Sequence, residues 1–305
     1  METRFETLIG FLGKFKDEET CRDFFEKLRF RNGAYCPHCG LMHVYRFKGG
    51  KRFRCAGCRQ DFTIITGTVF GESKIPLRKW FIAIYLLTTN HKGISSVQLA
   101  KQVGVTQKTA WFMDHRIRKA MKQSNGQLSG IIEIDETYVG GKERNKHAAL
   151  RTRGTQGRSV KTKTPVFGML QRGGEMRAKV VNDVRMVTLE KYIVESVRIG
   201  STLYSDELNS YDRIGKLFPH ERIRHAQGEY VRGSVHSNGA ESFWALFKRG
   251  YIGIYHFMSA KHLQRYVDEF AYRFNTNERE FQGVFGDLVH KVATTRGLPY
   301  KVLKA

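Results

Sequence analysis

The sequence has few acidic residues and no long hydrophobic run. Its 305 residues include 52 Lys and Arg but only 29 Asp and Glu, so the formal net charge is +23. The longest apolar run, Trp80–Leu87, is far shorter than the roughly 20 residues that span a bilayer. We therefore expect no membrane span. The excess of positive charge favours nucleic acid as the partner, ahead of an anionic membrane surface.

The sequence also lacks an export signal and the composition of a fibrous or disordered chain. The first residues, METRFETLIG, contain no basic segment followed by an apolar stretch, as a secretory signal requires. Apolar residues make up 41% and charged residues 27%, which excludes collagen-like, mucin-like and disordered proteins. We expect a folded cytoplasmic protein of about two domains, in which cysteines stay reduced.

Four of the five cysteines form two close pairs. The pairs are Cys36 with Cys39 and Cys55 with Cys58. Their C-x2-C-x15-C-x2-C spacing is typical of a zinc site, because tetrahedral Zn²⁺ takes four thiolates. Two pairs disfavour a thioredoxin-like redox motif, although spacing alone does not distinguish zinc from iron. We predict a zinc ribbon over residues 34–72 with one structural Zn²⁺, which leaves Cys21 as a buried thiol.

A basic segment lies between the two cysteine pairs. Residues 46–54, RFKGGKRFR, carry five basic side chains, no acid and two phenylalanines. A hairpin that displays Arg52 and Arg54 could contact the phosphate backbone of DNA. For any single residue of this segment, a solvated hairpin tip is an equally good interpretation.

The next segment has the pattern of a helix-turn-helix. Helical periodicity over residues 95–102 and 106–120 is interrupted at Gly104, and Thr106 is a good N-cap. We expect Val97, Ala100 and Val103 to face inward on the first helix, and Ala110, Met113 and Ile117 on the second. The side chains that we expect to face DNA are Gln107, Lys108, Arg116 and Arg118. An ordinary helical bundle would produce the same pattern.

From Ile131 onward, strand-like and helical segments alternate, which predicts an α/β layer with some parallel strands. The basic segment 142–163 carries eight Lys and Arg against one acid. It is either a loop that contacts DNA, through residues such as Lys142 and Lys146, or a solvated loop. The predicted divisions are 1–33 (helical segment), 34–72 (zinc ribbon), 73–125 (helix-turn-helix), 126–277 (α/β domain) and 278–305 (helical tail).

Three acids stand at the ends of predicted elements. Asp135 ends the apolar strand IIEID, Asp206 ends the strand STLYSD, and Glu241 begins an amphipathic helix. Lys248 lies seven residues after Glu241 and therefore on nearly the same helix face. Two aspartates and one glutamate could hold a pair of Mg²⁺ ions against a phosphodiester, with Lys248 on the DNA backbone.

Each acid also has a structural interpretation. A strand-end Asp is commonly a turn former or a cap, and Asn238-x-x-Glu241 resembles a capping box. Glu133 shares a strand face with Asp135, so the pattern does not decide between them, and Glu136 and Glu207 are further neighbours. The sequence contains no G-x-x-x-x-G-K-[ST] motif and gives no sign of ATP dependence.

Together these motifs resemble bacterial insertion-sequence transposases of the DDE class, in the zinc-ribbon family related to Merlin elements (ISXO-type). The segments that carry the resemblance are YCPHCG, RCAGC, PLRKWFIAIYLLTTNHKGISSVQLAKQVGVTQKTAWFMDHRIR, IDETYVGGKE, YSDEL and HSNGAESFWALFKRGYIGIYHFMSAKHLQRYVDEFAYRFN. The resemblance implies an RNase H-like core over 126–277, a mixed sheet with flanking helices. Residue by residue, Asp135, Asp206 and Glu241 match the catalytic triad, and Lys248 matches the basic residue after it. Asn238 remains a minor candidate, because some members use Asn as the third residue.

The family implies two catalytic Mg²⁺ ions and cut-and-join chemistry on double-stranded DNA. The substrates are the terminal inverted repeats of the element and a target duplex, and pairing two element ends favours a homodimer or higher oligomer. Such a protein is expected to associate with the nucleoid. The alternatives are a DNA-binding transcriptional regulator with a vestigial RNase H-like fold, and a nuclease that cuts without joining. The intact carboxylates favour an active transposase.

Overall fold

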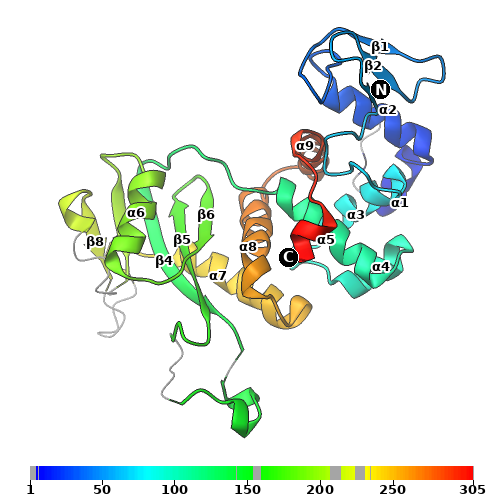
Figure 1. The fold of residues 1–305 in the computed structure, drawn as a ribbon. Coiled ribbons are helices and arrows are strands. Elements are labelled where there is room, and N and C mark those ends of the chain that lie inside the picture. Colours follow the sequence, from blue (N-terminus) through cyan, green and yellow to red (C-terminus); the bar gives the residue numbers. More distant parts are fainter. Residues whose placement is uncertain are drawn as a thin grey trace. The chain divides into compact units, whose positions relative to one another are not determined.

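The computed structural model in Figure 1 describes residues 5, 7–141, 143–153, 159–206, 214–223, 231–233 and 235–304. The chain divides into two compact units, each with its own core. The first unit comprises Met1–Met121 and Glu278–Ala305, and the second comprises Lys122–Asn277. The C-terminal segment therefore belongs to the same unit as the N-terminal segments.

The first unit is mainly helical, with one small sheet. Its helices are α1 (Leu8–Lys14), α2 (Glu18–Arg29), α3 (Leu77–Thr89), α4 (Ser96–Val103), α5 (Gln107–Ala120), α9 (Phe281–Thr294) and α10 (Tyr300–Lys304). Its strands are β1 (Val44–Arg46), β2 (Phe53–Cys55) and β3 (Asp61–Phe62), which form an antiparallel sheet in that order.

Side-chain caps explain where several of these helices begin. Thr7 and Asp17 accept hydrogen bonds from backbone N–H groups in the first turns of α1 and α2, which satisfies donors that have no partner within the helix. Helix α3 starts after a proline and has no such cap of its own. Instead, the Glu18 carboxylate accepts from the N–H groups of Leu77 and Arg78, at 2.8 and 3.0 Å.

The core of the first unit is built largely from phenylalanine. The Phe5 ring lies 5.4 to 5.9 Å from four other phenylalanine rings in edge-on contacts, a favoured geometry for aromatic pairs. Two of these rings, Phe281 and Phe285, belong to α9, and the other two belong to the N-terminal segment. This packing is what joins the two ends of the chain in one core.

The second unit contains a mixed five-stranded sheet in the order β6-β5-β4-β7-β8. Its strands are β4 (Ile131–Val139), β5 (Thr164–Gln171), β6 (Met176–Val180), β7 (Thr202–Ser205) and β8 (His220–Arg222). Strands β4, β5 and β6 pair antiparallel, while β7 and β8 run parallel to β4. This confirms the mixed α/β layer predicted from the alternating pattern.

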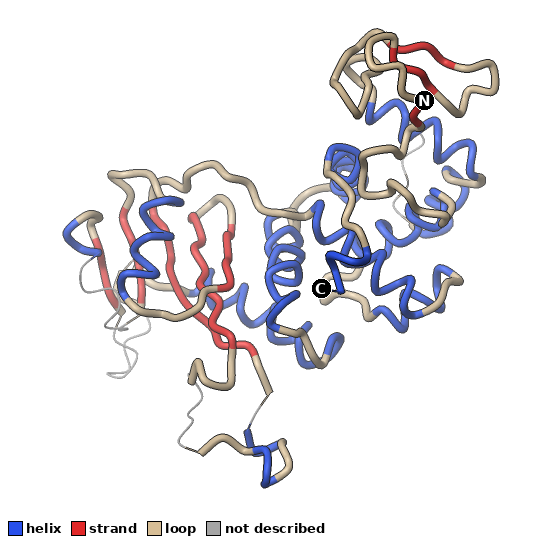
Figure 2. The backbone as a smooth tube through the Cα atoms, in the orientation of Figure 1, coloured by secondary structure: helices blue, strands red, loops and turns tan. Residues whose placement is uncertain are grey.

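Helices cover both faces of this sheet (Figure 2). Helix α6 (Met186–Ser196) packs on one face, against Ile132 and Ile134 of β4. Helices α7 (Asn238–Gly250) and α8 (Ala260–Asn275) pack on the other. Because side chains alternate along a strand, Glu133 and Asp135 of β4 point to the α7 face. The sheet thus presents its carboxylates to the helix that carries Glu241.

One glycine allows α7 to approach the sheet closely. Gly168 of β5 pairs with Asp135 of β4, and a Cβ there would lie 2.6 Å from the Trp244 ring of α7 and 2.6 Å from the Met176 side chain. Real Cβ atoms are essentially never that close to another heavy atom. The absence of a side chain at Gly168 is therefore what lets Trp244 lie directly over the strand next to Asp135.

Two further expectations can be compared with the fold. In the part of the chain that is described, no helix is both long enough and apolar enough to cross a bilayer. The alternating pattern also predicts a helix near Tyr211–Leu217, and between Ile214 and Lys216 the chain forms a 3₁₀ turn. Residues 207–213 lie outside the described residues.

Candidate active site and metal centres

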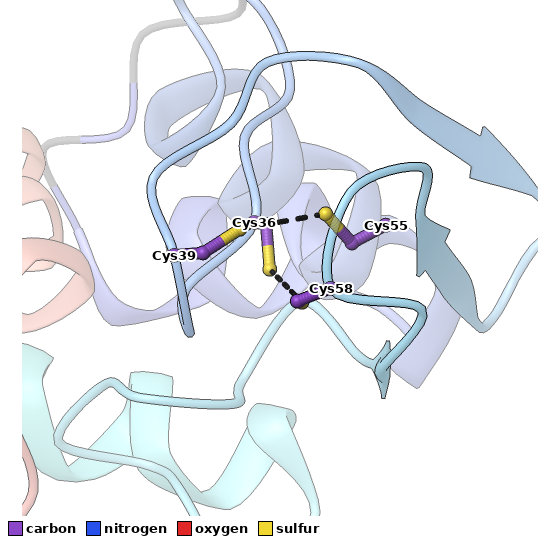
Figure 3. Close-up of side chains that lie close together, drawn as sticks. All are labelled: Cys36, Cys39, Cys55 and Cys58. Carbon is purple, nitrogen blue, oxygen red and sulfur yellow. Dashed lines mark hydrogen bonds between the residues drawn. The ribbon is translucent and has the colours of Figure 1, made fainter.

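The four paired cysteines gather at one point of the first unit. They lie where the chain enters and leaves the β1-β2 hairpin, and their sulfur atoms point toward one another (Figure 3). The Sγ atoms of Cys39 and Cys55 are 3.5 Å apart, and those of Cys36 and Cys58 are 3.6 Å apart. All four sulfurs lie within 4.8 Å of one another.

This geometry fits one tetrahedral ion. Four sulfurs at ~2.3 Å from a zinc ion would lie about 3.8 Å apart, close to the distances found. The backbone N–H of Cys58 donates to the Cys55 sulfur and lowers the pKa of that thiol to about 7, while burial and the neighbouring thiols raise the pKa of Cys58 to about 12. Metal binding needs thiolates and would release the remaining protons. Among the described residues, neither His38 nor His43 places a ring nitrogen in this cluster of sulfurs. The site is therefore a four-cysteine site.

The basic hairpin beside this site holds its arginines against aromatic rings. The Arg52 and Arg54 guanidinium groups lie 5.1 and 5.4 Å from the Phe47 ring, within the range of cation–π contacts. Arg54 also donates to Asp61 at 2.7 Å. Both arginines are exposed, and the interpretation of either as a DNA contact stays a prediction.

Helices α4 and α5 match the predicted helix, turn and helix. Gly104 takes a left-handed conformation with φ of 69° between them, and Thr106 caps α5 as predicted. Ala110, Met113 and Ile117 are buried as expected. On α4, however, Val97 is 54% exposed and Leu99 is buried in its place, so the predicted inward face of α4 was wrong at its start.

The second helix differs from the prediction at two arginines. Arg116 is only 5% exposed, and its Nη2 donates to the backbone carbonyl of Gly71 at 2.7 Å. Arg118 is 1% exposed and lies 3.9 Å from Asp114 on the same helix. Both arginines are therefore structural, and the expectation that they face DNA was wrong. Helical periodicity did not reveal this, because α5 is buried on more than one side from Met113 onward.

The structure describes three of the four other residues that were predicted to contact DNA. Gln107 and Lys108 are exposed at the start of α5. Gln107 donates to Ser96 at 2.9 Å, and the Lys108 ammonium lies 5.2 Å from the Tyr300 ring. Lys146 pairs with Glu143 at 2.5 Å, while Lys142 lies outside the described residues. All four stay predictions as DNA contacts.

The two aspartates meet where the parallel pairing of β4 and β7 ends. Ile134 of β4 pairs with Ser205 of β7, and the next residue in each strand direction is an aspartate, Asp135 and Asp206. Asp206 follows the last residue of β7, but β4 continues to Val139, so the prediction that Asp135 ends its strand was wrong. The parallel register of the two strands brings the carboxylates together all the same. One carboxylate oxygen from each of Asp135, Glu136 and Asp206 lies within 4.8 Å of the other two.

The environment of Asp135 opposes its negative charge. Burial, together with the charges of Glu136, Asp206 and Glu241, raises the pKa of Asp135 to about 8. The N–H of Glu136 donates to its carboxylate at 2.8 Å and only partly offsets this. A carboxylate cluster with too little positive charge nearby is one that a divalent cation would stabilise.

Glu241 and Lys248 both lie exposed on α7, as predicted. Glu241 is not part of the group formed by Asp135, Glu136 and Asp206. Its charge nevertheless raises the pKa of Asp135. The alternative interpretation of Asn238 and Glu241 as a capping box was wrong, because the N-cap of α7 is Ser237 and the third residue after it is Ala240. The Ser237 hydroxyl donates to the Glu241 carboxylate at 3.3 Å.

Glu133 has a structural role that the pattern could not assign. Its carboxylate accepts from Arg172 at 2.8 Å and from the backbone N–H of Ala240 at 3.0 Å. Glu133 thus caps the start of α7 from a neighbouring strand, and Arg172 also donates to the carbonyl of His236. Sequence reasoning missed Arg172, since nothing near it in the sequence links it to Glu133. Glu207 lies outside the described residues.

Comparisons with known proteins agree with this arrangement. The family profile of the ISXO2-like transposase domain matches residues 127–275, and that of the transposase zinc-ribbon domain matches residues 16–61. The first covers the sheet and the helices that carry the acids, and the second contains the cysteine cluster. The class of protein is therefore a transposase with a zinc ribbon.

Two relatives support the assignment. An "uncharacterized protein in transposable element ISH50" of Halobacterium salinarum is 34% identical over 250 residues, which is 77% of this chain and 83% of the relative. An "uncharacterized transposase-like protein" of Haemophilus influenzae is 32% identical over 104 residues, 34% of this chain and 83% of that protein. The chain belongs to the ISXO2-like transposase family, and a transcriptional regulator is not favoured.

Two solved structures show weak similarity. The Mos1 strand transfer complex has a TM-score of 0.28 with 13% identity and covers 70% of this chain and 74% of that one. The pre-cleavage Mos1 transpososome has a TM-score of 0.29 at 13% identity, with coverage of 72% and 79%. Similarity at this level supports no assignment by itself.

Proposed function

We propose that this transposase cuts and joins double-stranded DNA at the inverted repeats of an insertion sequence, with Asp135, Asp206 and Glu241 as the catalytic acids. The observation that carries the proposal is that Asp135 of β4 and Asp206, just after β7, come together where the parallel pairing of these strands ends. We also propose that the second unit is an RNase H-like core. Supporting this, the first three strands of the sheet pair antiparallel, β7 joins β4 in parallel, and β8 joins β7 in parallel.

The acids suit a pair of Mg²⁺ ions. Such a pair, when bound, activates a nucleophile and stabilises the leaving oxygen of a phosphodiester. Asp135 and Asp206 would supply ligands from the sheet and Glu241 from α7, with Glu136 as a further carboxylate within reach of the aspartates. Asp135 has to lose its proton before it can coordinate, because a protonated carboxyl is a poor ligand.

The reaction divides into two transfers at phosphorus. Water attacks a phosphodiester at the element end, the P–O bond to the departing strand breaks, and a 3′-hydroxyl is left. That hydroxyl then attacks a phosphodiester of the target, releasing a new 3′ end. Lys248, exposed on α7 two turns beyond Glu241, would hold the backbone phosphates in line, since positioning and charge neutralisation carry most of such catalysis.

The first unit would bind the element ends. The four-cysteine site, which we assign to one Zn²⁺, fixes the hairpin that displays Arg52 and Arg54. Helix α5 presents Gln107 and Lys108 from its capped start, the end of a recognition helix that meets base edges. Two copies on paired ends would form a homodimer or a higher oligomer.

The test is an assay with labelled duplexes that carry the inverted repeats flanking the gene. With Mg²⁺ and a target duplex, a transposase gives joined products, a nuclease gives cut ends only, and a DNA-binding regulator gives neither. Asp135→Asn should abolish cutting while leaving DNA affinity largely intact. Glu195→Gln, an exposed acid on α6, is the matched control and should cut normally. Cutting by Asp135→Asn would overturn the assignment.

A further inference from the structure

Two large apolar side chains are exposed just beyond the helix that carries Glu241 and Lys248. After α7 the chain forms a single π-helical turn, η6 (Tyr251–Tyr255). Ile252 is 68% exposed and Phe257 is 73% exposed. The two side chains are five residues apart in the sequence. Exposed apolar surface of this kind can mark a binding site, and π-helical turns occur frequently at functional sites.

The turn that presents these side chains is firmly held. The Tyr255 hydroxyl donates to the fully buried Glu269 at 2.9 Å, and its ring lies edge-on to that of Tyr266. Met258 is buried just after the turn. Since its neighbours anchor the segment on both sides, the exposure of Phe257 reflects a fixed backbone and not a poorly packed end.

The backbone of this turn is also open to close approach. A Cβ on Gly253 would meet no atom within 4 Å. His256 adopts a φ of 57°, which residues other than glycine rarely take, and a hydrogen bond from its N–H to the Tyr251 carbonyl closes the turn at 2.7 Å. An unusual backbone that is held in place in this way is a common feature of binding segments.

Charge identifies the kind of partner. From Ser242 to Val267 the sequence contains no Asp or Glu, while it contains Lys248, Arg249, Lys261 and Arg265. Lys248 and Arg249 are exposed directly before the turn. Exposed apolar side chains on a positively charged surface suit a polyanion with an apolar interior. Duplex DNA is such a partner, because its phosphates lie outside and its stacked bases inside. A stable protein interface needs roughly 800 Å² per partner, more than these two side chains supply.

Helix α7 also leads from the acids to this turn. It has 13 residues and is thus about 20 Å long, which corresponds to about six base pairs at ~3.4 Å each. DNA that lies along α7, with its cleaved phosphate at the acids and its backbone on Lys248, reaches Ile252 and Phe257 about six base pairs away.

We infer that Phe257 and Ile252 insert between base pairs of the bound DNA and open the stack near the cut. This inference rests on the proposed function and adds a specific contact to it. Apolar side chains that enter a base step unstack it at a cost of a few kcal/mol and are compensated by the contacts that the bent DNA gains. The basic residues of α7 supply such contacts with the phosphates.

The experiment uses the full-length protein and the flanking inverted-repeat duplex, labelled with 2-aminopurine at one position at a time. Binding is measured by anisotropy in Ca²⁺, which replaces Mg²⁺ so that the duplex stays intact. We expect a severalfold rise in fluorescence at one position about six base pairs from the cut. Phe257→Ala should remove most of this rise, Phe257→Tyr should keep it, and Ile252→Ala should reduce it.

Ile199→Ala is the matched control, because Ile199 is 85% exposed in the same unit and lies outside this segment. It should leave the signal unchanged. A flat signal at every position with the wild-type protein, or equal loss in Ile199→Ala, would overturn the inference. So would a Phe257→Ala protein that opens DNA normally but loses self-association, since the side chain would then serve a protein interface. If the wild-type protein also fails to cut this duplex in Mg²⁺, the proposed function itself has failed.

Discussion

At the level of single residues, Asp135 differs strongly from an ordinary aspartate. Its pKa is about 8 in the folded protein against 3.8 for an unperturbed aspartate, because it is buried beside other acids. Between these two pH values the metal-free folded state holds a proton that the unfolded state has lost. The free energy of unfolding of the metal-free protein therefore falls as pH rises through this range.

The first prediction concerns Asp135→Asn in protein kept free of Mg²⁺ with its cysteine site still loaded with zinc. The amide cannot ionise, so the variant should melt several degrees above the wild-type protein at pH 8, and the difference should shrink toward pH 4. Thermal unfolding across this pH range measures it. Asp183→Asn is a control of opposite sign: hydrogen bonds from Arg185 and Thr188 lower the pKa of Asp183, so its loss should not stabilise. No gain for Asp135→Asn at pH 8 would contradict the proposed environment.

The second prediction separates Glu133 from the catalytic acids. Glu133→Gln removes the charge that pairs with Arg172 and caps α7, so we expect a loss of about 1.5–3 kcal/mol in the free energy of unfolding. Urea titration would measure it. The variant should retain some cutting activity at a temperature where it is folded. Full stability together with complete loss of cutting would instead place Glu133 among the metal ligands.

At the level of elements, local patterns predicted more than long-range contacts did. The cap at Thr106 and the turn at Gly104 follow from neighbouring residues, and the structure has them. The strand that was predicted to end at Asp135 runs on to Val139, because its last four residues pair with β5. The burial of Arg116 depends on the carbonyl of Gly71, 45 residues earlier. A helical pattern cannot reveal a contact with a loop so far away, and for this reason the prediction of a DNA-facing Arg116 was wrong.

The third prediction concerns the packing of α7 on β5. Gly168→Ala places a methyl group against the Trp244 ring, so the helix must move away from the sheet, at a cost of about 1–3 kcal/mol. Gly141→Ala, where a Cβ would meet no atom within 4 Å, should be nearly neutral. Chemical denaturation of the two variants compares them. We also expect Gly168→Ala to cut DNA more slowly, because α7 carries Glu241.

The fourth prediction concerns the cysteine cluster. Cys36→Ser should abolish stoichiometric zinc binding and unfold the ribbon, because the metal supplies much of the folding free energy of so small a segment. Cys21→Ser, which alters a buried thiol outside the cluster, should keep the zinc. Metal analysis of the purified variants measures the bound zinc. A salt-matched DNA-binding assay measures the effect of the unfolded ribbon. Equal loss of zinc in both variants would contradict the four-cysteine assignment.

At the level of the whole molecule, the sequence predicted the class of protein better than its organisation. The net charge of +23 and the cysteine spacing indicated a metal-containing protein that acts on nucleic acid, and the family assignment agrees. The segment 278–305 was predicted as a separate tail, whereas the structure joins it to the N-terminal unit. That contact depends on Phe281 and Phe285 packing against Phe5. These residues lie at opposite ends of the sequence, and hydrophobic periodicity gives no information about contacts so far apart.

The central claim is that Asp135, Asp206 and Glu241 together hold divalent ions against DNA, and Mn²⁺ binding tests it most directly. Electron paramagnetic resonance counts the ions that the wild-type protein and Asp206→Asn bind in the presence of the end duplex. We predict about two ions for each wild-type active site and a loss of at least one in Asp206→Asn, with Glu195→Gln unchanged. An Asp206→Asn protein that binds as many ions as the wild-type protein, with equal affinity, would contradict the account.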